Sequence, residues 1–176
     1  MIFKEELISS ERIYEGKILN LRRDKVTAIQ GEAYREIIEH NGAVAMVAIN
    51  DNDDIVLVRQ FRYAVGRPVL EIPAGKIDKG EMDPLGAAVR ELKEETGYTA
   101  GSIKLLGKIN VSVAYSLEVI YLYLMTDLTA GEQQLDEDEA VEVIEMPFDE
   151  AYDMAARGEL VDAKTLAALM MAKEQR

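Results

Sequence analysis

Three glutamates lie close together near the end of a predicted helix, where they could bind a cation. Glu91, Glu94 and Glu95 belong to the segment 84–96, whose apolar residues recur at helical spacing. Residues three and four apart share one side of a helix, so the carboxylates are neighbours that repel each other. The negative end of the helix dipole disfavours them further. A divalent cation would offset both effects, since Mg²⁺ prefers oxygen ligands. The alternative is an ordinary solvated acidic face.

The residues around this segment contain signals for both ends of the helix. Asp83 is a good N-cap, and Pro84 suits the first helical position because its missing N–H is not needed there. Gly97 is typical of a helix C-terminus. The expected buried stripe consists of Leu85, Ala88, Val89 and Leu92. We therefore expect the three glutamates to lie beside the buried face of the helix.

A loop rich in glycine and charge is predicted just before the helix, over residues 74–83. It follows a strand that ends in Glu71-Ile72-Pro73. Gly75 and Gly80 allow the backbone to approach a ligand closely, and Glu81 adds a carboxylate. This combination favours a cation site over a solvated acidic face.

The loop and helix together resemble the Nudix box. That pattern is Gly, five residues, Glu, seven residues, then Arg-Glu-apolar-any-Glu-Glu-any-Gly-apolar. The matching residues are Gly75, Glu81, Arg90, Glu91, Leu92, Glu94, Glu95, Gly97 and Tyr98. Eight residues instead of seven separate Glu81 from Arg90. We expect the extra residue to lie at Met82 or Asp83, where the loop can absorb it.

The Nudix resemblance implies an α/β/α sandwich around a mixed sheet, and hydrolysis of a nucleoside diphosphate derivative with bound Mg²⁺ or Mn²⁺. The metal ligands it implies are Glu91, Glu95, Glu139 and the carbonyl of Ala74. Glu94 would be a further ligand or would orient one. The same resemblance makes Glu137 the base that takes the proton of water. Glu137 belongs to an acidic cluster at residues 135–140, whose alternative interpretation is a solvated loop.

Within the family, the chain is similar to ADP-ribose pyrophosphatases, which implies a set of substrate-binding residues. This set consists of Arg35, Glu36, Arg62, Glu71, Ser112 and Glu118. In that group the loop around Ser112 often reads Ser-Pro-Gly-any-Ser-any-Glu. Here Ser112, Ser116 and Glu118 fit, whereas the proline and glycine are absent. Arg62 is one of three arginines that precede the acidic loop and could bind phosphate oxygens bidentately; the alternative for each is a surface role.

The resemblance implies ADP-ribose as substrate, with AMP and ribose 5-phosphate as products. Two alternatives remain within the same fold. Another Nudix substrate, such as a nucleotide sugar or a dinucleoside polyphosphate, would keep the metal site and change the pocket. A non-catalytic sensor would bind ADP-ribose to regulate a partner. The intact Glu91, Glu94 and Glu95 argue against a sensor.

The resemblance implies a division of the chain into residues 1–40 and a Nudix domain over 41–176. The first part reads as antiparallel strands, and the resemblance implies that this small sheet forms a homodimer; the alternative is an ordinary edge sheet. In the second part, residues 42–49 predict a strand buried on both faces, in a hairpin with 55–61. Further strands are expected at 103–110, 117–125 and 141–146, and helices at 148–157 and 162–173, the last with Leu166, Leu169 and Met170 on its apolar face.

Composition narrows the partners that the protein can have. The net charge of −13 argues against nucleic-acid binding, which needs a basic surface. An anionic substrate would therefore need a local positive group or a bound metal ion. The sequence lacks an apolar run long enough for a membrane span and a signal-peptide pattern. It also lacks cysteine, and together these features predict a location in the cytoplasm.

Overall fold

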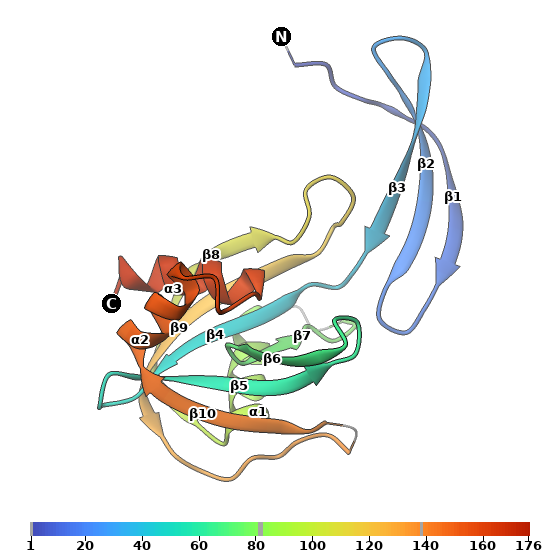
Figure 1. Cartoon of the computed structure of the whole chain (residues 1–176). Helices are drawn as coiled ribbons and strands as arrows, with labels where there is room; N and C mark the ends of the chain where they lie inside the picture. The colour runs from blue at the N-terminus through green and yellow to red at the C-terminus, as the bar shows by residue number, and fades with distance from the viewer. Residues whose placement is uncertain (1, 81–82, 138) are drawn as a thin grey trace. The chain divides into compact units, whose positions relative to one another are not determined.

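The computed structural model describes residues 2–80, 83–137 and 139–176, and it consists of two compact units. One unit comprises Met1–Gly42 together with Asn110–Val119. The other comprises Ala43–Ile109 together with Ile120–Arg176. Each unit has its own sheet, drawn in Figure 1.

The first unit is an antiparallel sheet in the order β1-β2-β3. Its strands are β1 (Leu7–Glu15), β2 (Asn20–Thr27) and β3 (Glu32–Glu39). The segment Asn110–Val119 joins this sheet through Ile38, whose N–H donates to the Tyr115 carbonyl at 2.7 Å. The Leu117 N–H in turn donates to the Ile38 carbonyl at 2.9 Å. The expected N-terminal antiparallel strands are present, and a later part of the chain is attached to them.

The second unit contains a mixed sheet in the order β10-β5-β4-β9-β8, with β6 beside β5 and β7 beside β4. β4 is parallel to β9 but antiparallel to β5 and β7, so the expected mixed sheet is confirmed. The strands are β4 (Ala43–Ile49), β5 (Asp54–Arg62), β6 (Arg67–Glu71), β7 (Ala74–Lys76), β8 (Thr99–Asn110), β9 (Val119–Thr129) and β10 (Val141–Pro147).

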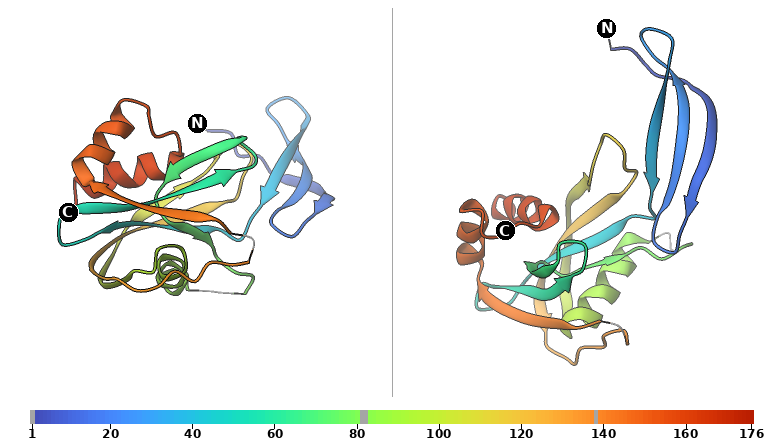
Figure 2. Two further views of the ribbon diagram at one scale, coloured as in Figure 1. Left: turned by 60° about the horizontal axis from the view of Figure 1, so that its bottom comes forward. Right: turned by 45° about the vertical axis from the view of Figure 1, so that its right-hand side comes forward.

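Helices cover both faces of this sheet (Figure 2). On one face α1 (Pro84–Thr96) packs Ala87, Ala88 and Leu92 against Val44 and Met46. On the other face lie α2 (Phe148–Ala156) and α3 (Ala163–Lys173), which pack against the alternate residues of the same strand. Because successive strand residues point to opposite faces, β4 is buried on both sides, as its continuous apolar run predicted. The α/β/α architecture is confirmed.

Both predicted ends of α1 are confirmed, but part of the predicted stripe is wrong. The Asp83 side chain accepts a hydrogen bond from the Leu85 N–H, and Gly97 adopts a φ of 78°. However, Leu85 and Val89 are 43% and 40% exposed. The two small alanines allow close approach to the sheet, which turns the buried face toward Ala87, Ala88, Leu92 and Glu95. Glu95 therefore lies within the buried face and not beside it.

Two further expectations needed correction. The hairpin of residues 42–49 with 55–61 pairs only at Ala48–Val56 and Ile49–Ile55. The rest of that edge of β4 pairs with β7, which lies in the segment predicted to be loop. In α3, Met170 is exposed because the buried side of this helix is formed by Thr165, Ala168, Leu169 and Ala172.

No helix in the described ranges is both long and apolar enough to cross a membrane.

Candidate active site

The carboxylate of Glu95 is buried at the end of α1, against the start of β7. Glu95 is only 4% exposed, and its Oε2 accepts a hydrogen bond from the Ala74 N–H at 2.9 Å. Burial raises the pKa of Glu95 to about 8, although the Ala74 N–H lowers it. The nearby carboxylates of Glu91 and Glu139 raise this pKa further. The helix thus holds a carboxyl group whose charged form is disfavoured by its burial.

Glu91 lies one turn earlier and reaches the same short strand. A Cβ added at Gly75 would lie 1.8 Å from the Cδ atom of Glu91, so only glycine leaves room for this carboxylate. Burial also raises the pKa of Glu91, whereas Arg90 lowers it. Two anionic side chains therefore meet the backbone at Ala74 and Gly75, which β7 holds beside β4.

Arg90 links the exposed side of the glutamate cluster. Its Nη1 donates to Glu91 Oε1 and to Glu94 Oε2, each at 2.9 Å. Its Nη2 also lies 3.4 Å from the Lys76 carbonyl oxygen, which ties the helix to β7. One arginine therefore orients two of the three predicted carboxylates.

The acidic segment after β9 is held against the end of α1. The Gln134 N–H donates to the Glu94 carbonyl at 3.0 Å, and Gln133 Nε2 donates to the Glu95 carbonyl at 2.6 Å. Further along, the Glu139 N–H donates to the Asp136 carbonyl at 3.0 Å. Glu139 lies close enough to Glu91 and Glu95 to raise their pKa values, while Glu137 is exposed. The structure thus brings the predicted ligand Glu139 to the two helix glutamates, although it lies more than 40 residues later in the sequence.

The donor set fits a hard divalent cation. It includes the carboxyl oxygens of Glu91 and Glu95, whose burial disfavours the charged form and raises their pKa values, and a bound cation would offset that cost. Within the described residues, however, no group of three or more acidic or histidine side chains lies close enough together to hold a metal ion. The further carboxylate predicted at Glu81 and the extra loop residue expected at Met82 both lie outside the described residues.

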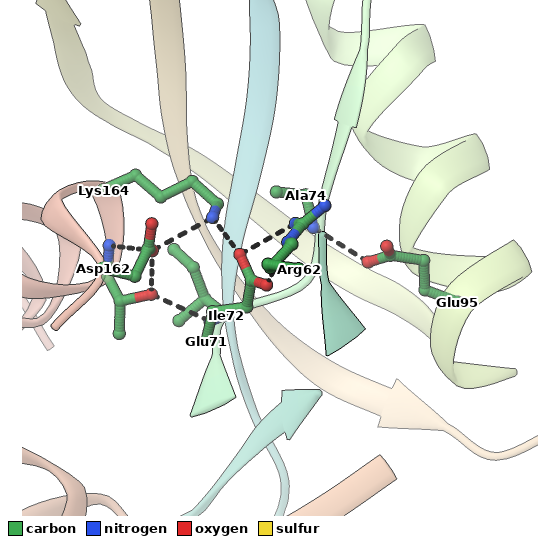
Figure 3. A network of polar contacts seen from close by, with 8 residues as sticks. Arg62, Glu71, Ile72, Ala74, Glu95, Asp162 and Lys164 are labelled. Atoms are coloured by element: carbon green, nitrogen blue, oxygen red, sulfur yellow. Dashed lines mark hydrogen bonds and ion pairs between the residues drawn. The ribbon is translucent and has the colours of Figure 1, made fainter. Parts of the chain in front are cut away.

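On the other side of β7, Arg62 and Glu71 form a paired ion contact (Figure 3). Arg62 Nε and Nη2 donate to the two carboxylate oxygens of Glu71 at 2.7 and 2.9 Å. Lys164 Nζ donates to the same carboxylate, and it also contacts Asp162 at 3.0 Å. Glu71 is 1% exposed, whereas the Arg62 side chain is 41% exposed. Arg62 can therefore face a ligand, while Glu71 is enclosed.

The remaining predicted substrate residues lie in the first unit. In β3, Arg35 pairs with Glu5, and the adjacent Glu36 is exposed. Adjacent strand residues point to opposite faces, so Arg35 and Glu36 lie on different faces of this sheet. The Ser112 carbonyl accepts a hydrogen bond from the Ser116 N–H at 2.9 Å. The substrate roles of these residues remain predictions.

Glu118 lies beside the only histidine. Its Oε1 is 3.7 Å from His40 Nδ1, which itself accepts a hydrogen bond from the Gly42 N–H at 3.0 Å. An Nδ1 atom that accepts a hydrogen bond carries no proton, so this contact is no ion pair. The geometry gives His40 a structural function at the end of β3.

An open pocket of about 610 Å³ lies next to the acidic segment, within the usual range for small-molecule sites. It is lined by Arg59, Gln60, Phe61, Pro68, Leu135, Ala140, Val141 and Glu142. Its walls come from β5, β6 and the residues on either side of the Glu137 turn. No pattern in the sequence predicted this pocket. Its one visible trace is Leu135, an apolar residue at the start of the acidic run.

Comparison with known proteins defines the class to which this fold and site belong. A family model described as the NUDIX domain matches residues 39–169, so the chain belongs to the Nudix family. The ADP-ribose pyrophosphatase of Bacillus subtilis (strain 168) is 40% identical, over 94% of this chain and 91% of that protein. The methanol dehydrogenase activator of Bacillus methanolicus is also 40% identical, over 96% and 92%.

A solved structure supports the fold independently. The crystal structure of an ADP compounds hydrolase matches with a TM-score of 0.86. It covers 99% of this chain and 95% of the other chain, at 24% sequence identity. The structural similarity thus extends over nearly the whole chain, and at this sequence identity it is evidence for the fold alone.

The buried charge of Glu95 predicts a measurable effect on stability. A carboxyl group with a raised folded-state pKa lowers stability as the pH rises from its unfolded value of about 4.5 toward 8. We expect Glu95→Gln to raise the free energy of unfolding by about 1–3 kcal/mol at pH 8 in the presence of a chelator. The gain should shrink as the pH falls to 5. Urea unfolding at both pH values measures it.

Glu94→Gln is the matched control for this measurement. It removes a carboxylate from the adjacent position, where the side chain is 34% exposed. Its effect should stay within about 1 kcal/mol at both pH values. If Glu95→Gln were no more stable than wild type at pH 8, the Glu95 carboxylate would be better compensated than its burial indicates.

Proposed function

We propose that this Nudix protein hydrolyses the pyrophosphate of ADP-ribose to AMP and ribose 5-phosphate. The observation that carries the proposal is the pair of carboxyl groups of Glu91 and Glu95 against the Ala74–Gly75 backbone, with Glu139 near enough to raise the pKa of both. The similarity to an ADP-ribose pyrophosphatase over nearly the full chain supports the choice of substrate.

The proposed metal is Mg²⁺, with Mn²⁺ as an alternative. Glu91, Glu95, Glu139 and the carbonyl of Ala74 would hold it. When bound, it would neutralise the diphosphate oxygens and activate water. Glu94 is held by Arg90, which suits a residue that orients the ligands beside it. The buried carboxylates also keep their oxygen atoms in fixed positions before any ligand arrives.

Glu137 is the proposed general base. It is exposed on the turn that also carries Glu139, so water can reach its carboxylate. A base needs to lie within hydrogen-bonding distance of the water it deprotonates, and the position of Glu139 beside the helix glutamates brings the turn toward them.

Arg62 is proposed to bind the diphosphate. Glu71 accepts hydrogen bonds from its Nε and Nη2 atoms, and the Arg62 side chain as a whole is 41% exposed. Guanidinium groups bind phosphate oxygens well because their N–H donors have fixed geometry. The pocket walled by Phe61, Pro68 and Val141 offers an apolar surface for a base or a sugar.

The first unit is proposed to form a homodimer. β1 is exposed along its whole length, and large apolar residues are exposed on this sheet: Leu7, Ile8, Ile13, Tyr14, Ile18, Ile29 and Tyr34. A small sheet that buries so little of its apolar surface is marginal by itself. Contact with a second copy would bury these residues, with Arg35 and Glu36 of one copy near the substrate held mainly by the other.

Two other activities remain as alternatives. A nucleotide sugar or a dinucleoside polyphosphate would use the same carboxylates with a different occupant of the pocket. A non-catalytic ADP-ribose sensor would not need them, and their buried, mutually repelling arrangement favours an enzyme. The lack of cysteine suits a protein of the reducing cytoplasm, where we place it.

Hydrolysis itself is the first test. Purified protein should convert ADP-ribose to AMP and ribose 5-phosphate with Mg²⁺, and excess EDTA should abolish turnover because the glutamates alone cannot neutralise the substrate. Chromatography of the products of ADP-ribose, a nucleotide sugar and a dinucleoside polyphosphate measures the preference. Faster cleavage of another compound would change the substrate, whereas turnover at full rate in EDTA would remove the metal from the mechanism.

A second test addresses the base. Glu137→Gln keeps the shape of the side chain but cannot accept the proton, so kcat should fall roughly 10²–10⁴-fold while KM changes little. Glu132→Gln, an exposed position in the same acidic segment, is the control and should retain wild-type kcat. Full activity of Glu137→Gln would assign the base to another carboxylate.

A third test concerns assembly. Full-length protein should be a dimer by light scattering at micromolar concentration, with an interface above roughly 1,000 Å². Removal of residues 1–40 should give a monomer that binds ADP-ribose more weakly, while the Glu91 metal site survives because it lies in the second unit. A full-length monomer that hydrolyses ADP-ribose at the full rate would contradict the dimer proposal.

A further inference from the structure

The contact between Arg62 and Glu71 belongs to a larger buried network that extends into α3 (Figure 3). Besides the Arg62 and Lys164 contacts to Glu71, Asp162 Oδ2 accepts hydrogen bonds from Lys164 Nζ, the Thr165 N–H at 3.0 Å and Thr165 Oγ1 at 2.6 Å. The network contains two cations and two anions, and none of its buried side-chain polar atoms lacks a partner. It lies on the opposite side of β7 from α1.

This network anchors the strand segment that ends at the candidate active site. The Ile72 N–H donates to Thr165 Oγ1 at 3.0 Å, which fixes the backbone one residue after Glu71. Two residues further on, the Ala74 N–H donates to Glu95. The segment from Glu71 to Ala74 is thus held by α3 at one end and by α1 at the other.

Lys164 is needed because Glu71 is a buried carboxylate that serves two cations at once. A buried anion is costly unless it is paired and hydrogen bonded. With Lys164 present, the Glu71 carboxylate is paired with two cations and holds Arg62 by two parallel hydrogen bonds. With Lys164 removed, the negative charge of Glu71 would be balanced by Arg62 alone, which would lower the positive potential that Arg62 offers to a ligand.

We propose that Lys164, acting through Glu71, is a positioning residue that holds the Arg62 guanidinium for a diphosphate ligand. Glu71 itself is too enclosed to touch a ligand, so its function is to orient Arg62. The proposal rests on the proposed function in one respect: Arg62 contacts the diphosphate. It predicts an effect on ligand affinity more than on the chemical step, because the carboxylates of α1 are anchored separately.

The test compares Lys164→Met with Lys173→Met. Lys173 lies in the same helix and also forms an ion pair, with Asp149 at 2.6 Å, but it has no contact with Glu71. Two quantities are measured with Mg²⁺ present. One is the dissociation constant of ADP by calorimetry; the other is KM and kcat for the nucleoside diphosphate derivative that wild type cleaves fastest.

For Lys164→Met we expect the ADP dissociation constant and KM to rise roughly tenfold, with kcat within about twofold of wild type. Lys164→Arg should restore most of the affinity, and Lys173→Met should change neither quantity. A merely structural function of Lys164 would lower the melting temperature and leave KM unchanged. If Lys164→Met did not fold, Lys164→Gln would be measured in the same way, with the same two readings.

Three results would overturn the proposal: equal ADP affinity in Lys164→Met and Lys173→Met, a fall in kcat with unchanged ADP affinity, or no binding of ADP by wild type. Failure of the proposed function gives a different pattern. In that case wild type would not cleave ADP-ribose, yet ADP would bind and Lys164→Met would still weaken it.

Discussion

The hydrogen bond from the Ala74 N–H to the buried Glu95 carboxylate is the contact on which the rest of the site depends. It places an anion in the packed face of α1, where apolar residues would be more stable. Because the anion is held there, the start of β7 must lie against the end of the helix. The next residue, Gly75, leaves room for the Glu91 carboxylate because glycine has no Cβ.

The strand β7 is short, and the elements on its two sides keep it in place. β4 supplies backbone pairing at Ala43–Ala45, and α1 supplies the carboxylates. On the far side, α3 contributes Lys164 and Thr165, which bind Glu71 and the Ile72 N–H. The carboxyl groups of α1 and the charges of the Glu71 network therefore lie on the two sides of β7. Arg62 lies near both, because Glu71 holds it and its charge lowers the pKa of Glu95. A change in α3 can in this way reach the site without touching a ligand.

Local signals in the sequence were sufficient for the helix that carries the site. Asp83, Pro84 and Gly97 predicted its ends, and the structure has the same ends. The buried face was harder, because hydrophobicity favoured Leu85 and Val89 over two alanines and a glutamate. Packing of α1 against the sheet determines which of its faces is buried, and the sequence of the helix does not show which sheet residues it will contact. The resemblance to the Nudix box added an expectation that local rules could not supply, namely that the acidic residues form one site.

Contacts between distant segments were largely beyond sequence reasoning. β7 is three residues long and was interpreted as loop, since its pairing with β4 depends on a register that no pattern displays. Lys164 was missed for a related reason: a lysine in the first turn of a helix is usually on the surface. The sequence Asp162–Thr165 was a visible cap signal, but its connection to Ile72 spans 93 residues.

The charges around the site explain why metal and substrate should bind together. Five acidic side chains lie around it, and Arg90 and Arg62 are already bound to carboxylates. The acidic residues are Glu91, Glu94, Glu95, Glu137 and Glu139. Lys164 is neutralised in the same way by Glu71 and Asp162. An anionic diphosphate approaching such a site, on a chain with a net charge of −13, would be repelled by the ionised carboxylates. Bound divalent cations would reverse that balance, because they would neutralise both the carboxylates and the diphosphate oxygens. We therefore expect the divalent cation and the diphosphate to raise each other's affinity, because each carries the charge that the other needs in order to bind.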